Sequence, residues 1–317
     1  MAGINAQAIK ELRERTQAGM SDCKSALTEA EGDMDKAVEI ILKKGLAKSA
    51  KKASAAATEG EVRASVSADK RRATMVEVNI QTDFAARNDS FRDFVGEVLA
   101  AAEKASAGAK LGEVTLASGK TIADAATELT GRIGEKIDAR RWDVVEIPEG
   151  KHGAVAAYVH LGGKIGVIVA VETDTALVAS HREVVKFLEE TAMQAAAMSP
   201  VALRREDISD EDKAKQKEIF EGQLREDPKP KPEAAWPKII EGKFNKWYSE
   251  AVLLEQESVE AASRGVSGQT IEKLRAEAEK AAGGSVTVTR FVRFERGEGI
   301  AKKEDDFAAE VAKMASA

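Results

Sequence analysis

The feature that most constrains the fold of this chain is an internal repeat in its middle. Two stretches, "EVRASVSADKRRATMVEVNIQTDF" (61–84) and "AVAAYVHLGGKIGVIVAVETD" (154–174), carry valines at matching intervals. Alternation of apolar and other residues is typical of half-buried strands, so each stretch predicts a β-hairpin. The matching valines are Val62, Val66, Val76 and Val78 in the first copy, and Val155, Val159, Val169 and Val171 in the second.

Each predicted hairpin is followed by the same order of elements. A helix begins at "SFRDFV" (90–95) or at "SHREVV" (180–185), and a second helix opens at "SGKTI" (118–122) or at "SGQTI" (267–271). A final strand then closes each copy, near 141–147 and 285–294. The predicted fold class is therefore α+β, a duplicated sandwich of helices on antiparallel sheets.

The two copies differ in length just before a shared Thr-Asp pair. Val78 and Thr82 are four positions apart, whereas Val171 and Thr173 are two positions apart. We therefore expect two extra residues in the first copy to lift Phe84 away from its own sheet. Binding residues are usually presented on loops of this kind. Asp174, at the corresponding place in the second copy, is expected to be a helix cap.

Three further segments flank or interrupt the repeat. The first half of the repeat is 56–150, and the second half is 151–200 together with 259–296. Residues 1–55 predict three short helices, the last closing before Gly45, and 47–60 is a linker or an exposed helix. Residues 201–258 predict a hairpin of two antiparallel helices, whose aromatic stripe closes the hairpin on itself or contacts a second copy or a partner. Residues 297–317 predict a C-terminal helix through Phe307, either docked on the chain or reserved for a partner.

Composition and charge exclude several classes of function. The net charge is −6 and aromatic residues make up 4%, which disfavours binding to nucleic acid. No apolar run approaches the roughly 20 residues of a membrane span. Cys23 is the single cysteine and there are three histidines, so we expect no disulfide, no metal site and a cytoplasmic location.

The sequence contains no motif of a catalytic or cofactor site. GxSxG, HExxH and the P-loop pattern are all missing, and "LGGKIG" (161–166) reads as a turn inside a hairpin. Large apolar residues instead occur at loops and termini. Separated patches of this kind suit an extended protein interface better than one reactive cleft, so we expect neither an enzyme nor a bound cofactor. The residues in question are Met20, Phe84, Ile133 and Phe307.

Several segments resemble the bacterial translation elongation factor Ts family, in the family's order. They are "LRERTQAGMSDCKSAL" (12–27), "TDFAARND" (82–89), "RIGEKIDARR" (132–141), "HLGGKIGVIVA" (160–170) and "RFVRFERGEGIAKKEDDFAAEV" (290–311). The similarity runs from Ile9 almost to the C-terminus and is weakest over 200–258. The resemblance implies guanine-nucleotide exchange on elongation factor Tu, without catalysis of a covalent reaction. It also implies that the N-terminal bundle is similar to a ubiquitin-associated domain.

Carried over residue by residue, the resemblance implies a role for one loop above all. Asp83 and Phe84, with their neighbours Thr82 and Ala85, would push into the GTPase near its nucleotide-bound Mg²⁺. The hairpin at 201–258 is a dimerisation element in some relatives, so a homodimer through it is a further implication. The remaining implied contacts with the partner are Arg13, Met20, Ile133, Gly134, His160 and Phe307.

Two other classes of function stay open on the sequence alone. A binding adaptor would recognise a ubiquitin-like or helical partner through residues 1–55, and would keep that binding in the isolated segment. A hydrolase would need clustered acids with perturbed pKa values in one pocket.

Overall fold

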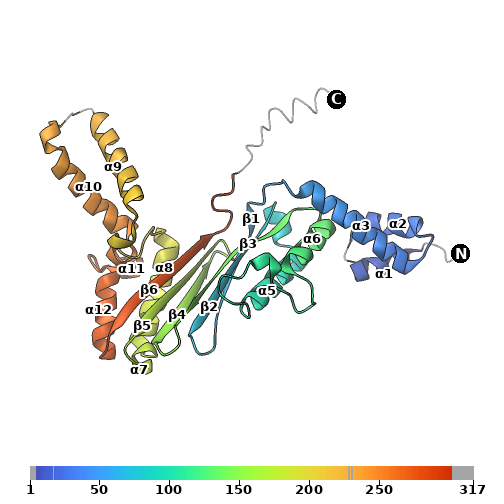
Figure 1. Cartoon of the computed structure of the whole chain (residues 1–317), viewed down its shortest axis with the longest axis horizontal. Helices are drawn as coiled ribbons and strands as arrows, with labels where there is room; N and C mark the ends of the chain where they lie inside the picture. Colours follow the sequence, from blue (N-terminus) through green and yellow to red (C-terminus); the bar gives the residue numbers. More distant parts are fainter. Residues whose placement is uncertain (1–4, 17, 228, 230, 302–317) are drawn as a thin grey trace.

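The computed structural model describes residues 5–16, 18–227, 229 and 231–301. At its centre lie two three-stranded antiparallel sheets (Figure 1). Both predicted hairpins and their closing strands are confirmed, and the fold is α+β. The first sheet has the order β1 (Glu59–Val66), β2 (Arg72–Ile80), β3 (Ile137–Glu146), and the second has the order β4 (His152–His160), β5 (Ile165–Thr173), β6 (Val286–Glu295).

The two sheets pack face to face, an arrangement that the sequence pattern did not predict. Val62 and Met75 of the first sheet share a buried cluster with Ile168 and Ala170 of the second. A Cβ on Gly166 would lie 2.5 Å from Val62 and 2.6 Å from Met75, so the close approach requires glycine there. Because both faces of the central strands β2 and β5 are covered, most of their residues are buried.

Helices cover the outer face of each sheet. The first sheet carries α5 (Asp89–Ala102) and α6 (Ile122–Ile133), and the second carries α8 (Arg182–Met198) and α12 (Ile271–Ala282). α6 and α12 begin at the two predicted "SGxTI" sites. Thr121 and Thr270 cap them by accepting hydrogen bonds from the backbone N–H groups of Asp124 and Lys273. The layers are therefore helix, sheet, sheet, helix.

The N-terminal segment forms a bundle of three helices, as predicted. They are α1 (Ala6–Thr16), α2 (Met20–Glu29) and α3 (Met34–Lys52), packed around Leu12, Cys23 and Leu27. The expected end of α3 before Gly45 is wrong, because the helix continues to Lys52. This stretch packs along α6, and that contact outweighs the low helix propensity of glycine.

The insertion is a helical hairpin that projects from the second half of the core (Figure 1). Its helices are α9 (Asp210–Arg225) and α10 (Trp236–Ala251), with Phe220, Leu224 and Ile240 buried between them. Phe244 and Trp247 pack against the same cluster, so part of the aromatic stripe packs within the hairpin. Short elements complete the fold: α4 (Asp83–Ala86), α7 (Ala176–Ala179), α11 (Val259–Ser263), η1 (Leu111–Glu113), η2 (Arg205–Asp207), η3 (Glu233–Ala235) and η4 (Leu253–Glu255).

The turn that follows β6 is fixed to the first sheet by a buried carboxylate. Glu77, on β2, accepts hydrogen bonds from the Gly297 N–H at 2.7 Å, from Arg140 at 3.2 Å and from Arg141 at 2.5 Å. Arg141 also pairs with Glu298 at 3.1 Å. The network lies at the β-bulge between β2 and β3, and it anchors the segment that leads into the C-terminal residues.

Candidate functional site

Phe84 lies on the one-turn helix α4, directly after the central strand of the first sheet. Thr82 is its N-cap, with Oγ1 accepting a hydrogen bond from the Ala85 N–H at 3.2 Å. The Thr82 N–H and hydroxyl in turn donate to the Glu135 carboxylate, at 2.9 and 2.8 Å. This capped turn buries Ala85 and leaves Phe84 86% exposed. The expected exposed ring is therefore present, on a backbone held from two sides.

The Asp83 carboxylate lies beside this ring and is open to solvent. Arg87, one helical turn further on, donates to it at 3.2 Å, and both side chains are mostly exposed. An exposed pair of this kind contributes about 0–1 kcal/mol. Exchanging Arg87 for a group on another molecule would therefore cost Asp83 little free energy.

The expected difference in length between the two halves is wrong. β2 ends at Ile80 and the cap Thr82 follows two residues later, while β5 ends at Thr173 and the cap of α7 is Thr175, again two residues later. The Thr-Asp pair misled the comparison, because Thr175 and not Asp174 accepts the hydrogen bond that starts the helix. The place that Phe84 occupies on α4 is taken on α7 by Leu177, which is 81% exposed.

The N-terminal bundle and the first half of the core enclose a cavity of about 680 Å³ beside Phe84. Gly19, at the start of α2, lines it, and the next residue, Met20, is 49% exposed. The fold thus gathers residues that are far apart in the sequence around one concave surface. Predicted site residues on its lining are Arg13, Phe84, Ala85 and Ile133.

The chain turns sharply where α6 ends at this cavity. Gly134 caps the helix with a φ of 86°, a left-handed conformation that favours glycine. Ile133 was expected to be exposed, but it is half-buried and packs against the core of the first half. Glu135 follows directly and reaches Thr82, so the end of α6 and the loop of Phe84 are joined.

Predicted site residues that the structure describes and that do not line this cavity are Met20, Thr82, Asp83, Gly134 and His160. His160 ends β4, and its Nδ1 lies 2.8 Å from the Tyr158 hydroxyl. The turn after it is confirmed at "LGGKIG" and is docked on the first sheet, because the Val62 N–H donates to the Gly163 carbonyl at 2.8 Å. Phe307 lies outside the described residues.

Sequence reasoning missed two residues at this site, Arg132 and Glu135. Arg132 lines the cavity together with Arg13, which gives the wall beside the ring a positive charge. Glu135 fixes the cap of α4. Both lie in the segment 132–141, which the family resemblance had marked as a whole, but only a structure connects Glu135 to Thr82.

In the part of the chain that the structure describes, no cluster of three or more His, Cys, Asp or Glu side chains is arranged to hold a metal ion. Cys23 is buried in the bundle, and burial raises the pKa of its thiol. None of the helices within the described ranges is long and apolar enough to span a bilayer.

The geometry is that of an α+β protein with an exposed ring and carboxylate on a capped turn, next to a cationic wall. The profile of the family described as Elongation factor TS matches residues 81–298. Two proteins named Elongation factor Ts are similar over nearly the whole chain. The one from Clostridium perfringens is 42% identical over 313 residues, covering 98% of this chain and 99% of the relative. The one from a Nitratiruptor species is 45% identical over 310 residues, covering 98% of each.

The chain therefore belongs to the elongation factor Ts family. Membership places it among the elongation factors of protein biosynthesis, with an exchange-factor function.

Proposed function

We propose that this chain is a guanine-nucleotide exchange factor for elongation factor Tu and promotes the release of GDP during translation elongation. Family membership supports the exchange role. The observation that carries the proposal is the exposure of Phe84 on a backbone held by Thr82 and Glu135. Removing such a ring from water contributes about 1.5–3 kcal/mol, which in a partner would offset the cost of displacing the partner's loops.

In this proposal Asp83 and Phe84 act as a wedge. A GTPase holds GDP through donors around the phosphates and through a bridging Mg²⁺. Because α4 is capped, Phe84 can enter the partner without the entropy loss of ordering a flexible loop. A ring and a negative carboxylate beside the nucleotide site displace the partner's loops and weaken its hold on the phosphates. GDP then leaves faster, and no bond is made or broken.

Thermodynamic linkage completes the cycle. Whatever weakens nucleotide binding in the complex must also make nucleotide weaken the binding of this chain, by the same factor. Entry of GTP into the emptied site therefore releases the exchange factor, which can act again on another molecule.

The other proposed contacts hold the wedge in place. Arg13 and Met20 of the bundle, and Ile133 and Gly134 at the end of α6, lie around or next to the cavity, so they would contact the part of the partner that receives Phe84. His160 lies outside the cavity and would contact a different part of the partner. Phe307 would add a contact from the C-terminal segment.

We also propose the finer architecture that the resemblance implies. The bundle at 1–55 is similar to a ubiquitin-associated domain, and the core consists of two repeated halves, supported by their equal strand orders and by the caps Thr82 and Thr175. A homodimer through 201–258 is supported by a groove of about 860 Å³ on the hairpin, lined in part by Trp236, Phe244 and Tyr248. The proposed location is the cytoplasm.

The test is the rate of release of fluorescent GDP from elongation factor Tu, chased with unlabelled GDP, with and without the full chain. A catalytic amount of the chain should accelerate release from a large excess of the GTPase. Binding without acceleration would overturn the exchange proposal and favour the adaptor.

A further inference from the structure

The N-terminal bundle meets the core where two helices cross at a pair of glycines. Gly45 lies within α3 and Gly131 is buried within α6. A Cβ added to Gly131 would lie 2.5 Å from the Cα of Gly45 and 2.6 Å from its carbonyl carbon and oxygen, distances that real Cβ atoms do not reach. A Cβ added to Gly45 would lie 3.5 Å from the Cα of Gly131, an ordinary contact. The crossing therefore depends on the missing side chain of one glycine far more than of the other.

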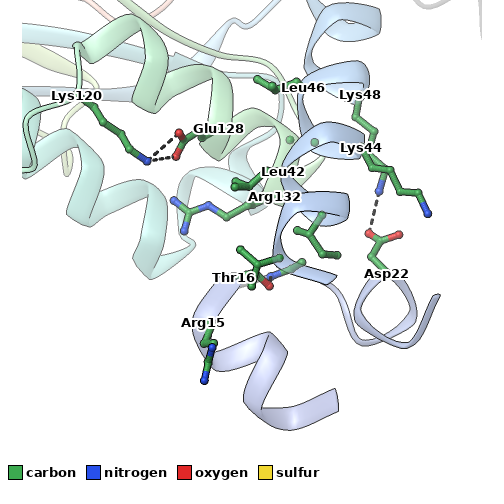
Figure 2. Close-up of a pocket in the computed structure, with 15 residues that line it drawn as sticks. Arg15, Thr16, Asp22, Leu42, Lys44, Leu46, Lys48, Lys120, Glu128 and Arg132 are labelled. Atoms are coloured by element: carbon green, nitrogen blue, oxygen red, sulfur yellow. Dashed lines mark hydrogen bonds and ion pairs between the residues drawn. The ribbon is translucent and has the colours of Figure 1, made fainter. Parts of the chain in front are cut away.

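A cavity borders this crossing. A cavity of about 350 Å³ lies between α3 and α6, and Figure 2 shows the half-exposed Leu42 and Leu46 of α3 facing the α6 side chains across it. Ion pairs at its margin join residues of the same side, Lys48 with Asp22 in the bundle and Lys120 with Glu128 in the core. At this junction the backbones of α3 and α6 are in direct contact at the two glycines, next to the cavity.

Both helices lead from the crossing into the candidate site. α6 ends at Ile133, and Glu135 then holds the cap of the loop that carries Phe84. α3 belongs to the bundle that brings Arg13 to the lining of the cavity beside Phe84. The separation of α3 and α6 thus sets how far the bundle wall lies from the ring.

We propose that Gly131 is a positioning residue, whose missing side chain sets the N-terminal bundle at the distance from Phe84 that productive binding of the GTPase requires. This inference rests on the proposed exchange function. A methyl group at Gly131 must push α3 away by about 1 Å to restore normal contact distances. The backbone of Gly131 is helical, so alanine causes no conformational strain there, and the effect comes from the crossing alone.

The first test compares Gly131→Ala with Gly45→Ala, the same chemical change on the two sides of one contact. GDP release from elongation factor Tu is measured against the concentration of each variant. Gly131→Ala should raise the half-saturating concentration about tenfold, because displaced bundle contacts weaken binding and each 1.4 kcal/mol of lost binding free energy is a factor of ten. The maximal rate should change by less than about twofold, since the wedge and its cap lie on the core. Gly45→Ala should match the unsubstituted chain in both quantities.

The second test measures the position of the bundle without the GTPase. Spin labels on Lys24→Cys in α2 and Asp93→Cys in α5, in a Cys23→Ala background, report the distance between bundle and core by pulsed electron resonance. Gly131→Ala should shift or broaden the distribution, and Gly45→Ala should leave it unchanged. An unchanged distribution in Gly131→Ala, or a shifted one with an unaltered half-saturating concentration, would overturn the inference.

The two readouts separate this inference from the proposed function. If the unsubstituted chain does not accelerate GDP release, the exchange function fails, while the label distances still report whether Gly131 sets the bundle. If Gly131→Ala does not fold, the double variant Leu42→Ala, Leu46→Ala replaces it, because it loosens the junction by removing half-exposed side chains. It should broaden the distances and raise the half-saturating concentration, and no effect on either would overturn the inference.

Discussion

The loop that carries Phe84 is held by one carboxylate from another segment. Glu135 accepts two hydrogen bonds from Thr82, whose hydroxyl in turn accepts the hydrogen bond that starts α4. Phe84 itself makes no contribution to the core, since Ala85 and not the ring faces inward. At this site Phe84 is therefore the exposed residue, and Thr82 and Glu135 hold its loop in place.

Replacing Glu135 should remove the support of the loop that carries Phe84. Glu135→Ala removes hydrogen bonds to a charged acceptor at a half-buried position, so the free energy of unfolding should fall by about 1–2 kcal/mol. The loop should also lose its fixed orientation, and exchange should slow about tenfold. Urea denaturation and GDP release measure the two effects. The adjacent Lys136→Ala is the control, and equal effects of both variants would contradict the assigned role of Glu135.

Cys23 should be unreactive while the bundle is folded. Burial raises the pKa of its thiol, so the neutral form is favoured in the native state, and its contribution to stability is lost as pH rises through the raised value. Reaction with a disulfide reagent near pH 8 should proceed only as fast as the bundle opens. Rapid modification of the native chain, at the rate of an unfolded control in denaturant, would contradict the burial of Cys23 in the bundle.

At the level of elements, β2 connects the core, the site and the C-terminal segment. Glu77 on this strand holds the turn after β6 through Gly297, Arg140 and Arg141. Five residues further along the chain, Thr82 starts α4. One strand thus precedes the loop of Phe84 and holds the turn at 297–298.

Removing the Glu77 carboxylate should weaken this connection. Glu77→Ala leaves two arginines without their buried partner, and because both remain partly exposed we expect a loss of about 2–4 kcal/mol in the free energy of unfolding. The exposed Glu97→Ala serves as control and should stay within about 0.5 kcal/mol of the original chain. Urea denaturation measures the free energy of unfolding of both variants. A nearly unchanged value for Glu77→Ala would show that the network does not stabilise the fold.

The elements were predictable wherever local periodicity decides them. The valine spacing predicted β1, β2, β4 and β5, and the matching segments "SGKTI" and "SGQTI" predicted the starts of α6 and α12. The end of α3 was not predictable, because packing on α6 overrides Gly45. The repeat was aligned two residues out of register at its Thr-Asp pair, since only hydrogen bonding shows that Thr175 is the cap. The exposed ring was predicted, but from a difference in length that the structure does not show, and its support by Glu135 comes from a contact between segments.

At the level of the whole molecule, the site and the inserted hairpin lie apart. Figure 1 shows the N-terminal bundle at one end of the molecule and the α9–α10 hairpin at the other, with the paired sheets between them. The two packed sheets of the core separate the N-terminal bundle from the α9–α10 hairpin. Such an arrangement suits a partner gripped at several separate points more than a small ligand enclosed in one cleft.

The most direct measurement of the central claim is stopped-flow GDP release from elongation factor Tu with Phe84→Ala and Leu177→Ala. The two residues occupy matching places on α4 and α7 and are almost equally exposed, at 86% and 81%. Phe84→Ala should lower the maximal release rate by about tenfold or more, while complex formation weakens much less. Leu177→Ala should leave both unchanged. An undiminished release rate with Phe84→Ala would contradict the wedge and the account built on it.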